Sequence, residues 1–133
     1  MALIKTARAI LLNPERQVLL ARRPWTSKSR PGQLDFFGGR SNGGESSVQT
    51  AIRETLEESA IDLTGAKLEQ VYRVIERDGP NQYLREYFRA IIPEFPTATL
   101  TEHVSQLILP GLVAVEELSF APHRNALTNA LGA

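Results

Sequence analysis

The sequence contains no cysteine and only one tryptophan and one methionine among its 133 residues. The lack of cysteine excludes disulfide bonds, thiolate metal ligands and cysteine nucleophiles. No apolar run approaches the roughly 20 residues that a membrane-spanning helix needs, and residues 1–8 are too short and too interrupted for a signal peptide. We therefore expect a soluble, cytoplasmic protein without a membrane partner. The length predicts a single domain over residues 1–133.

The formal net charge is also zero, but the two signs are concentrated in different parts of the chain. Residues 1–40 hold eight basic and two acidic side chains, a net charge of +6, whereas residues 45–62 hold one basic and five acidic side chains, a net charge of −4. Two solvated faces explain this pattern, and so does a site in which carboxylates bind cations while basic groups bind a polyanion. No basic run is dense enough for a nucleic-acid track, so nucleic acid is not an expected partner.

Hydrophobic segments and turn signals predict a mixed sheet with two helices. We expect strands over residues 2–12, 17–22, 34–37 and 112–115, and a hairpin of residues 67–77 and 82–92 around the turn Asp78-Gly79-Pro80-Asn81. Residues 23–33 and 93–102 contain prolines and are expected to be loops. A capping box of Ser46 and Gln49 predicts where one helix begins, and residues 122–131 are expected to form the other.

The first of these helices combines an apolar face with a ridge of carboxylates. At 100° per residue, one face is predicted to hold Val48, Ala51, Ile52, Thr55, Leu56 and Ser59. Glu54, Glu57 and Glu58 stand at i, i+3 and i+4 and form a ridge roughly 130° away. Like charges at this spacing repel by a few tenths of a kcal/mol, about what a helical ion pair contributes. Mg²⁺ or Mn²⁺ would relieve the repulsion, and an exposed glutamate-rich face is the alternative.

Residues 39–61 resemble the Nudix box, whose acidic and glycine positions follow a fixed spacing. Gly39 is followed after five residues by Glu45, and the pairs Arg53-Glu54 and Glu57-Glu58 stand at the box spacing before Ile61. The resemblance therefore covers every charged position of the box.

Two positions depart from the family pattern. Thr55 replaces a large aliphatic residue and is still expected to face the core, and Ala60 replaces the glycine that ends the helix. A left-handed conformation would cost alanine about 1–2 kcal/mol. We therefore expect this helix to end with a slightly different geometry.

The resemblance implies an α/β/α sandwich around a mixed sheet and a hydrolase in which water attacks a phosphorus of a nucleoside diphosphate derivative. It implies Mg²⁺ as cofactor, with Mn²⁺ as the alternative, and a small-molecule diphosphate as partner. Carried over by position, Glu57 and Glu58 would be the main metal ligands, Glu54 a further ligand or water activator, Arg53 the residue that orients a glutamate, Gly39 a carbonyl ligand and Glu45 a supporting loop residue.

Candidate site residues outside the box are supported by weaker sequence signals. The resemblance implies an acidic residue after the hairpin, for which Glu102 beside His103 is the candidate and Glu86 the reserve. Each of the other candidates also has an interpretation without a function. A phosphate-binding role and a place on the solvated surface are the two interpretations of the basic residues Arg22, Arg23, Lys28, Arg30 and Arg40. His123 and Arg124 either contact the substrate or begin a helix on the surface, and the aromatic residues Trp25, Phe36 and Phe37 either stack on a nucleobase or pack in the core.

The sequence leaves the substrate open among nucleoside triphosphates, ADP-ribose, nucleotide sugars and dinucleoside polyphosphates. A non-catalytic Nudix module that binds a nucleotide for regulation is the alternative function. The intact set Glu54, Glu57 and Glu58 favours catalysis. A homodimer is a family-level expectation only.

Overall fold

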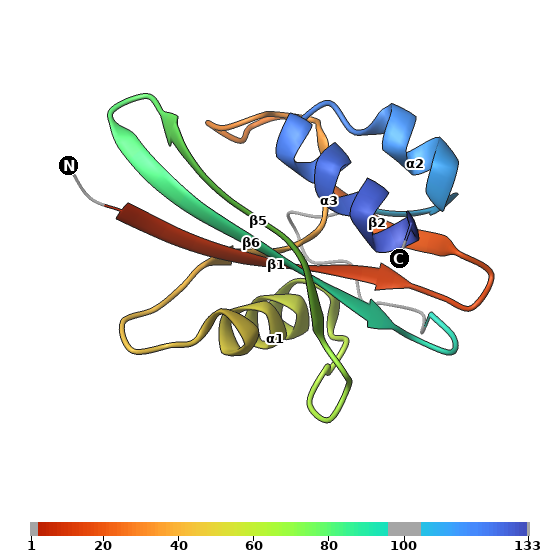
Figure 1. Cartoon of the computed structure of the whole chain (residues 1–133). Coiled ribbons are helices and arrows are strands. Elements are labelled where there is room, and N and C mark those ends of the chain that lie inside the picture. The colour runs from red at the N-terminus through yellow and green to blue at the C-terminus, as the bar shows by residue number, and fades with distance from the viewer. Residues whose placement is uncertain (1–2, 96–104, 133) are drawn as a thin grey trace.

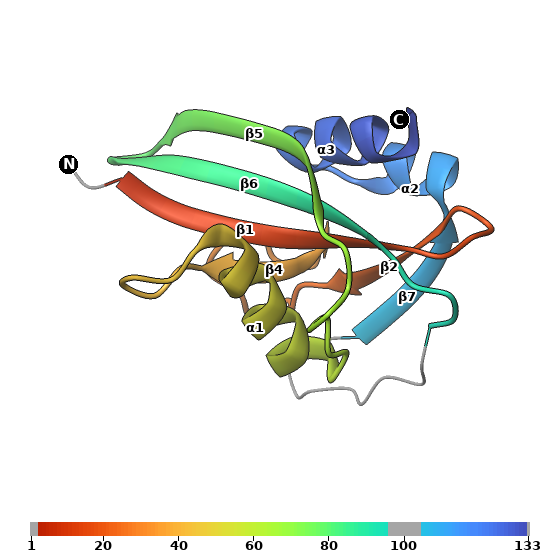
Figure 2. The same cartoon turned by 60° about the horizontal axis from the view of Figure 1, so that its bottom comes forward.

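A mixed sheet runs through the molecule, with helices on both of its faces (Figures 1 and 2). The computed structural model describes residues 3–95 and 105–132. In chain order the elements are β1 (Leu3–Leu12), β2 (Gln17–Arg22), β3 (Leu34–Asp35), β4 (Phe37–Arg40), α1 (Ser47–Ser59), β5 (Glu69–Asp78), β6 (Asn81–Ile91), β7 (Ser105–Pro110), α2 (Gly111–Glu117) and α3 (Ala121–Gly132). None of the helices in the described ranges is long and apolar enough to cross a membrane.

Strand β1 lies at the centre of the sheet and changes partners along its length. One edge pairs in parallel with β6 over the whole strand, and β6 forms the predicted hairpin with β5. The other edge pairs antiparallel first with β4 and then, at its end, with β2. This register sets Ala7 opposite Gly39 and Arg8 opposite Gly38, so β4 brings the start of the box against β1.

Each face of the sheet has its own hydrophobic core, because successive side chains of a strand point to opposite sides. Ala7, Ala9 and Leu11 of β1 belong to the core that includes Ala51 of α1. Ile10 and Leu12 belong to the other core, which is completed by α2 and α3. The expected α/β/α sandwich around a mixed sheet is therefore confirmed, and the figures show α1 on one side of β1 and α3 on the other.

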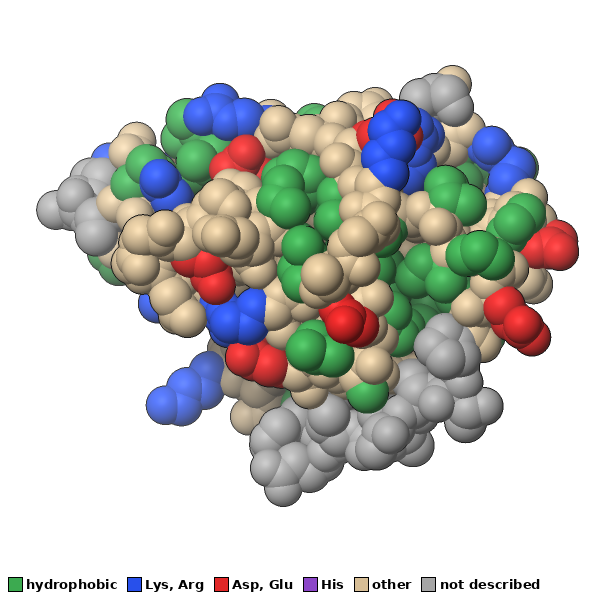
Figure 3. All heavy atoms as spheres, turned by 90° about the horizontal axis from the view of Figure 1, so that it is seen from below, with side chains coloured by type: hydrophobic (Ala, Val, Ile, Leu, Met, Phe, Trp, Pro, Cys, Tyr) green, Lys and Arg blue, Asp and Glu red, His purple; other side chains and the backbone are tan. Residues whose placement is uncertain are grey.

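Helix α1 begins with the predicted capping box. The Ser46 hydroxyl accepts a hydrogen bond from Gln49 N at 3.1 Å, and the Gln49 side chain accepts one from Ser46 N at 2.8 Å. The buried face was predicted only in part. It consists of small residues, which let the helix lie close to β1 and β4: Thr50, Ala51, Thr55 and Ser59. Val48 and Leu56 were expected on that face but are exposed, and hydrophobic side chains do reach the surface on this side of the molecule (Figure 3).

Helix α1 ends at Ala60 in a left-handed conformation, with a φ of 64°. Our expectation of a different geometry is therefore wrong, because alanine occupies the conformation that usually favours glycine. The Ala60 N–H donates to Leu56 O and satisfies a terminal carbonyl of the helix. The left-handed end of α1 therefore carries a steric cost of about 1–2 kcal/mol.

The carboxyl-terminal part differs from the prediction in two elements, β7 and α2. Residues 112–115 were expected to be a strand but lie within α2, and β7 supplies the strand that pairs with β2. A short apolar run does not separate strand from buried helix by periodicity alone. The structure adds a third helix to the two expected ones.

The predicted strand over residues 34–37 is divided into β3 and β4, and β4 continues through Gly38 and Gly39.

Candidate active site

Two glycines of β4 allow α1 to bring its glutamates against the sheet. A Cβ atom on Gly39 would lie 2.8 Å from Glu54 Cδ, and one on Gly38 would lie 2.2 Å from Ala7 O. Gly38 N donates a hydrogen bond to Glu58 Oε1 at 2.9 Å. No larger side chain fits at either position without moving the strand or a carboxylate, so these glycines fix where Glu54 and Glu58 lie.

Arg53 holds the acidic residues of the box in one network. Its guanidinium donates to both carboxylate oxygens of Glu45, at 2.8 and 3.0 Å. The same group donates to Glu54 at 3.0 Å, to Glu57 at 3.3 Å and to Arg40 O at 3.0 Å. The Arg53 hydrogen bond is the main cause that lowers the pKa of Glu45 to about 2. Arg53 therefore contacts Glu45, Glu54 and Glu57 at once, and the roles of Arg53 and Glu45 stay predictions.

Glu58 is a partly buried carboxylate whose ionised form its surroundings disfavour. Burial raises its pKa to about 8; the Gly38 N–H opposes this shift, and the charges of Glu54 and Asp35 add to it. Without a compensating cation the carboxyl is therefore largely neutral near pH 7. A cation beside Glu58 would reverse this balance.

The donor set of this region fits a hard divalent cation. Carboxylate and carbonyl oxygens are the ligands that Mg²⁺ and Mn²⁺ prefer, and Glu54, Glu58 and the Gly39 backbone lie together. Glu57 joins them only through Arg53, and its side chain is 56% exposed. Within residues 3–95 and 105–132, no three His, Cys, Asp or Glu side chains are already arranged around a common metal position.

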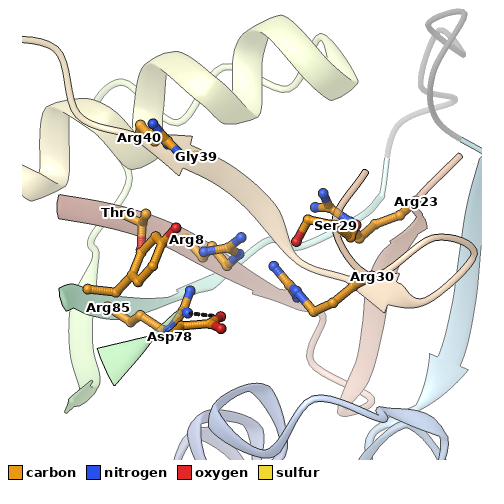
Figure 4. Close-up of a pocket in the computed structure, with 10 residues that line it drawn as sticks. Thr6, Arg8, Arg23, Ser29, Arg30, Gly39, Arg40, Asp78 and Arg85 are labelled. Carbon is orange, nitrogen blue, oxygen red and sulfur yellow. Dashed lines mark hydrogen bonds and ion pairs between the residues drawn. The ribbon is translucent and has the colours of Figure 1, made fainter. Parts of the chain in front are cut away.

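Next to Gly39 the surface opens into a cavity of about 190 Å³ (Figure 4). We call this cavity the arginine pocket, because five of its ten lining residues are arginines: Arg8, Arg23, Arg30, Arg40 and Arg85, with Thr6, Ser29, Gly39, Asp78 and Tyr83. Of the basic residues that the sequence left unranked, Arg23, Arg30 and Arg40 line it, whereas Arg22 and Lys28 do not. Sequence reasoning missed Arg8 and Arg85, although a charged residue between the small apolar residues Ala7 and Ala9 of β1 was a usable signal.

The base of the arginine pocket is built on the buried carboxylate of Asp35. Asp35 accepts hydrogen bonds from Arg8 Nε at 3.0 Å and Arg23 Nη1 at 3.1 Å. Arg30 Nη1 lies 3.9 Å away, and His123 Nε2 lies 2.8 Å away. Burial alone would raise the pKa of Asp35, but the positive charge of Arg8 and the hydrogen bond with His123 outweigh burial and hold it well below its usual value. Asp35 is therefore ionised and gathers cations beneath the pocket.

His123 is buried in this network at the start of α3 and is not on the surface, so the surface alternative is wrong. Burial lowers the pKa of His123 to about 4, which leaves the ring neutral at pH 7. Its Nε2 lies 2.8 Å from Asp35 Oδ1 and 3.0 Å from Arg30 Nη1, and its Nδ1 lies 2.7 Å from the Tyr87 hydroxyl. His123 thus ties α3 to β6 and to Asp35.

The comparisons with known proteins agree with this geometry. The NUDIX domain model matches residues 3–130. The chain belongs to the Nudix family. No curated protein sequence matches it.

Solved structures share the Nudix fold over nearly the whole chain. A MutT protein from Methanosarcina mazei has 21% sequence identity and a TM-score of 0.81, covering 98% of this chain and 94% of its own. The dihydroneopterin triphosphate pyrophosphohydrolase of E. coli has 19% identity and a TM-score of 0.81, with 97% and 96% covered. The NUDIX domain of Shewanella oneidensis NrtR, complexed with ADP ribose, has 20% identity and a TM-score of 0.77, with 100% and 90% covered. At these identities the likeness establishes the fold.

The other candidates are distributed around the Nudix site. Glu86 accepts hydrogen bonds from Ser47, in the first turn of α1, and from Gln70, and so lies at the opposite end of the helix from Glu58. Phe36 and Phe37 are core residues of opposite faces, and Trp25 is 77% exposed. Arg124 donates to Leu118 O and Ser119 O at the start of α3. Glu102 and His103 lie outside the described residues, so the role of Glu102 stays a prediction.

Proposed function

We propose that this Nudix protein is a metal-dependent hydrolase that cleaves the diphosphate linkage of a nucleoside diphosphate derivative by attack of water at phosphorus. One observation carries the proposal: Gly39 borders both the carboxylates of α1 and the arginine pocket. The cleavage of a diphosphate builds negative charge on phosphoryl oxygens, and enzymes stabilise it mainly by positioning and electrostatics. Carboxylates can hold a cation that stabilises this charge, and guanidiniums can position the substrate by binding its phosphate oxygens.

Glu54, Glu57 and Glu58 and the carbonyl of Gly39 would hold the metal ion, Mg²⁺ or Mn²⁺. The ion would neutralise phosphoryl charge and lower the pKa of a bound water. The raised pKa of Glu58 supports this assignment, because a buried carboxyl of that kind gains most from a neighbouring cation.

The remaining residues would position these groups. Arg53, which donates to Glu45, Glu54 and Glu57, would keep Glu54 aimed at the metal or the attacking water through a charge-assisted hydrogen bond. Gly38 N–H fixes one oxygen of Glu58 and so leaves the other available. Glu102 is proposed as a further acidic residue from the loop after the hairpin, and a homodimer remains a family-level prediction.

The proposal is tested by a panel of diphosphate compounds with Mg²⁺ or Mn²⁺. The panel includes dihydroneopterin triphosphate, after which one structural neighbour is named, and ADP-ribose, with which another is complexed. We expect metal-dependent turnover of at least one compound. The loss of a direct ligand in Glu58→Gln should reduce kcat by more than the roughly 100-fold that supporting residues of metal sites contribute. Glu117→Gln, an exposed change in α2, is the matched control and should retain full activity.

Two results would overturn the assignment. Undiminished turnover by Glu58→Gln would remove Glu58 from the mechanism. Ligand binding without turnover across the whole panel would favour the alternative, a regulatory module that binds a nucleotide. The ADP-ribose complex of the NrtR NUDIX domain makes ADP-ribose the first ligand to titrate in that case.

A further inference from the structure

Arg8 carries a buried guanidinium that the chain satisfies only in part. Its side chain is 7% exposed, and its Nε donates to Asp35 at 3.0 Å. Its Nη1 atom is buried and has no hydrogen-bond partner in the described part of the chain. An unsatisfied buried donor costs about 1–3 kcal/mol, and more when the group is charged. An acceptor from outside the chain would remove that cost.

The surroundings of Arg8 hold more positive charge than the chain neutralises. Arg8, Arg23 and Arg30 share the single carboxylate of Asp35, three positive charges against one negative. His123 is neutral and adds nothing. The pKa of Arg30 is lowered, first by burial, which outweighs the attraction of Asp35, and then by the positive charges of Arg8 and Arg23. An excess of about two positive charges matches a phosphate group, which carries −1.5 to −2 at pH 7.

Aromatic rings and acids hold the guanidiniums of this cavity in place. Arg85 donates to Glu76 at 2.8 Å and lies over the Tyr83 ring at 4.5 Å. Arg30 lies over the Phe120 ring at 4.1 Å. Arg30 also has a φ of 47°, a conformation that non-glycine residues rarely adopt. Such strain persists only where the surroundings enforce it, and it is concentrated at functional sites.

The three guanidiniums come from separate parts of the chain and face one space. Arg8 extends from β1, Arg85 from β6 and Arg30 from the loop between β2 and β3, and Figure 4 shows them around a common opening. Gly39 and Arg40 form the border of that opening on the side of α1. A group bound there would lie next to the carboxylates that contact Gly39.

We propose that the arginine pocket binds a phosphate group of the substrate in addition to the diphosphate that is cleaved. The substrate is then a nucleotide with at least three phosphates, either in one chain, as in a nucleoside triphosphate, or with one on the sugar. Arg8, Arg30 and Arg85 are the recognising residues. This inference rests on the proposed function, because it names the substrate class of the same site.

The test compares matched substrates on matched variants. ATP against ADP probes a phosphate at the end of the chain, and adenosine 3′-phosphate 5′-diphosphate against ADP probes one on the sugar. Arg30→Gln is the main variant, because Arg30 Nη1 lies 3.9 Å from Asp35 and its loss leaves the direct bonds of Arg8 and Arg23 to Asp35 in place. The change also removes the 3.0 Å contact of Arg30 with His123 Nε2. Lys67→Gln removes the same charge from a side chain that is 84% exposed and is the control.

We expect the wild type to prefer one of the two triply phosphorylated compounds by kcat/KM. Arg30→Gln should reduce that preference about 10-fold or more, the effect of one hydrogen bond to a charged group, mainly through KM. Lys67→Gln should leave the preference unchanged. The pair that shows the preference identifies the position of the phosphate. A wild type that turns over ADP as well as both other compounds would overturn the proposal.

A binding measurement separates this proposal from the proposed function. Calorimetric titration with inorganic phosphate, without metal, should show binding to wild type and Lys67→Gln and at least about 10-fold weaker binding to Arg30→Gln and Arg8→Gln. Equal phosphate binding by all four proteins, or no binding by the wild type, would overturn the proposal that the arginine pocket binds phosphate, even if metal-dependent turnover is found. Arginine-dependent phosphate binding without turnover of any compound would instead support the pocket and contradict the hydrolase.

Discussion

The carboxylate ridge of α1 and the arginine pocket meet at Gly39, but the chain builds them in opposite ways. The ridge takes Glu54, Glu57 and Glu58 from a single helix, where Arg53 pairs with Glu54 and Glu57 and Gly38 N donates to Glu58. The arginine pocket takes its cations from β1, β6 and a loop and sets several of them around one buried acid, Asp35. The ridge therefore depends on local helix geometry, whereas the pocket depends on long-range pairing and a buried charge.

The largest effect on stability is expected from the buried acid of the arginine pocket. Asp35→Asn removes the shared partner of Arg8 and Arg23 and leaves buried cations uncompensated, which typically costs about 3–5 kcal/mol. Urea unfolding measures the change. Asp78→Asn is the control, because its side chain is 64% exposed and its ion pair with Arg85 contributes about 1 kcal/mol at most. A loss below 1 kcal/mol for Asp35→Asn would mean that Asp35 does not hold the pocket together.

A second prediction concerns the pH dependence of stability, because one group in each region has a shifted pKa and the two shifts change stability with pH in opposite directions. The folded pKa of His123 lies at about 4, below its ordinary value of 6.5, so stability is lost as pH falls from about 6.5 to 4. The folded pKa of Glu58 is raised, so the contribution of Glu58 to the free energy of unfolding is lost as pH rises from about 4.5 to 8. This change opposes the one caused by His123. The two effects are separated by using Glu58→Gln as the background.

In that background, His123 should account for about 3 kcal/mol of stability lost between pH 7 and pH 4, at 1.36 kcal/mol for each pKa unit. Urea unfolding at a series of pH values measures it, and the double variant Glu58→Gln, His123→Asn should lose about 3 kcal/mol less over the same range. Equal pH dependence in the two proteins would show that His123 is not held neutral beneath the pocket.

The smallest expected effect lies at the end of the ridge helix. Ala60→Gly relieves the left-handed alanine, a gain of about 1–2 kcal/mol, but increases the entropy of the unfolded chain by about 0.4–1 kcal/mol. We therefore expect thermal unfolding to show a net stabilisation of between about 0 and about 1.6 kcal/mol. Ala66→Gly, at an exposed position without positive φ, has only the entropic effect and should destabilise. Destabilisation by both changes would contradict the left-handed helix end.

The ridge and the sandwich were predictable from sequence because their signals are local. The capping box of Ser46 and Gln49 fixes where α1 begins, and the spacing of three glutamates then fixes their common direction. Val48 and Leu56 were misplaced because apolar character alone does not show that α1 packs close to the sheet through smaller residues. Residues 112–115 were misassigned because a short β-branched run fits both a strand and a helix.

The arginine pocket was not predictable in the same way, because its parts meet only through tertiary structure. Arg8 and Arg85 become neighbours in one cavity because β1 pairs in parallel with β6. His123 looked like a surface helix start, since nothing near it in sequence reveals that Tyr87 and Asp35 enclose its ring. The one early sign was Arg8 itself, a charged residue that stands between Ala7 and Ala9 in the buried half of β1.

The central claim, that the carboxylate ridge binds a divalent cation, is tested most directly by titrating Mn²⁺ into the protein without substrate and following the bound metal by electron paramagnetic resonance. We expect saturable binding to wild type and Glu117→Gln and binding weakened by more than about 100-fold in Glu58→Gln. Equal Mn²⁺ affinity in all three proteins would contradict it.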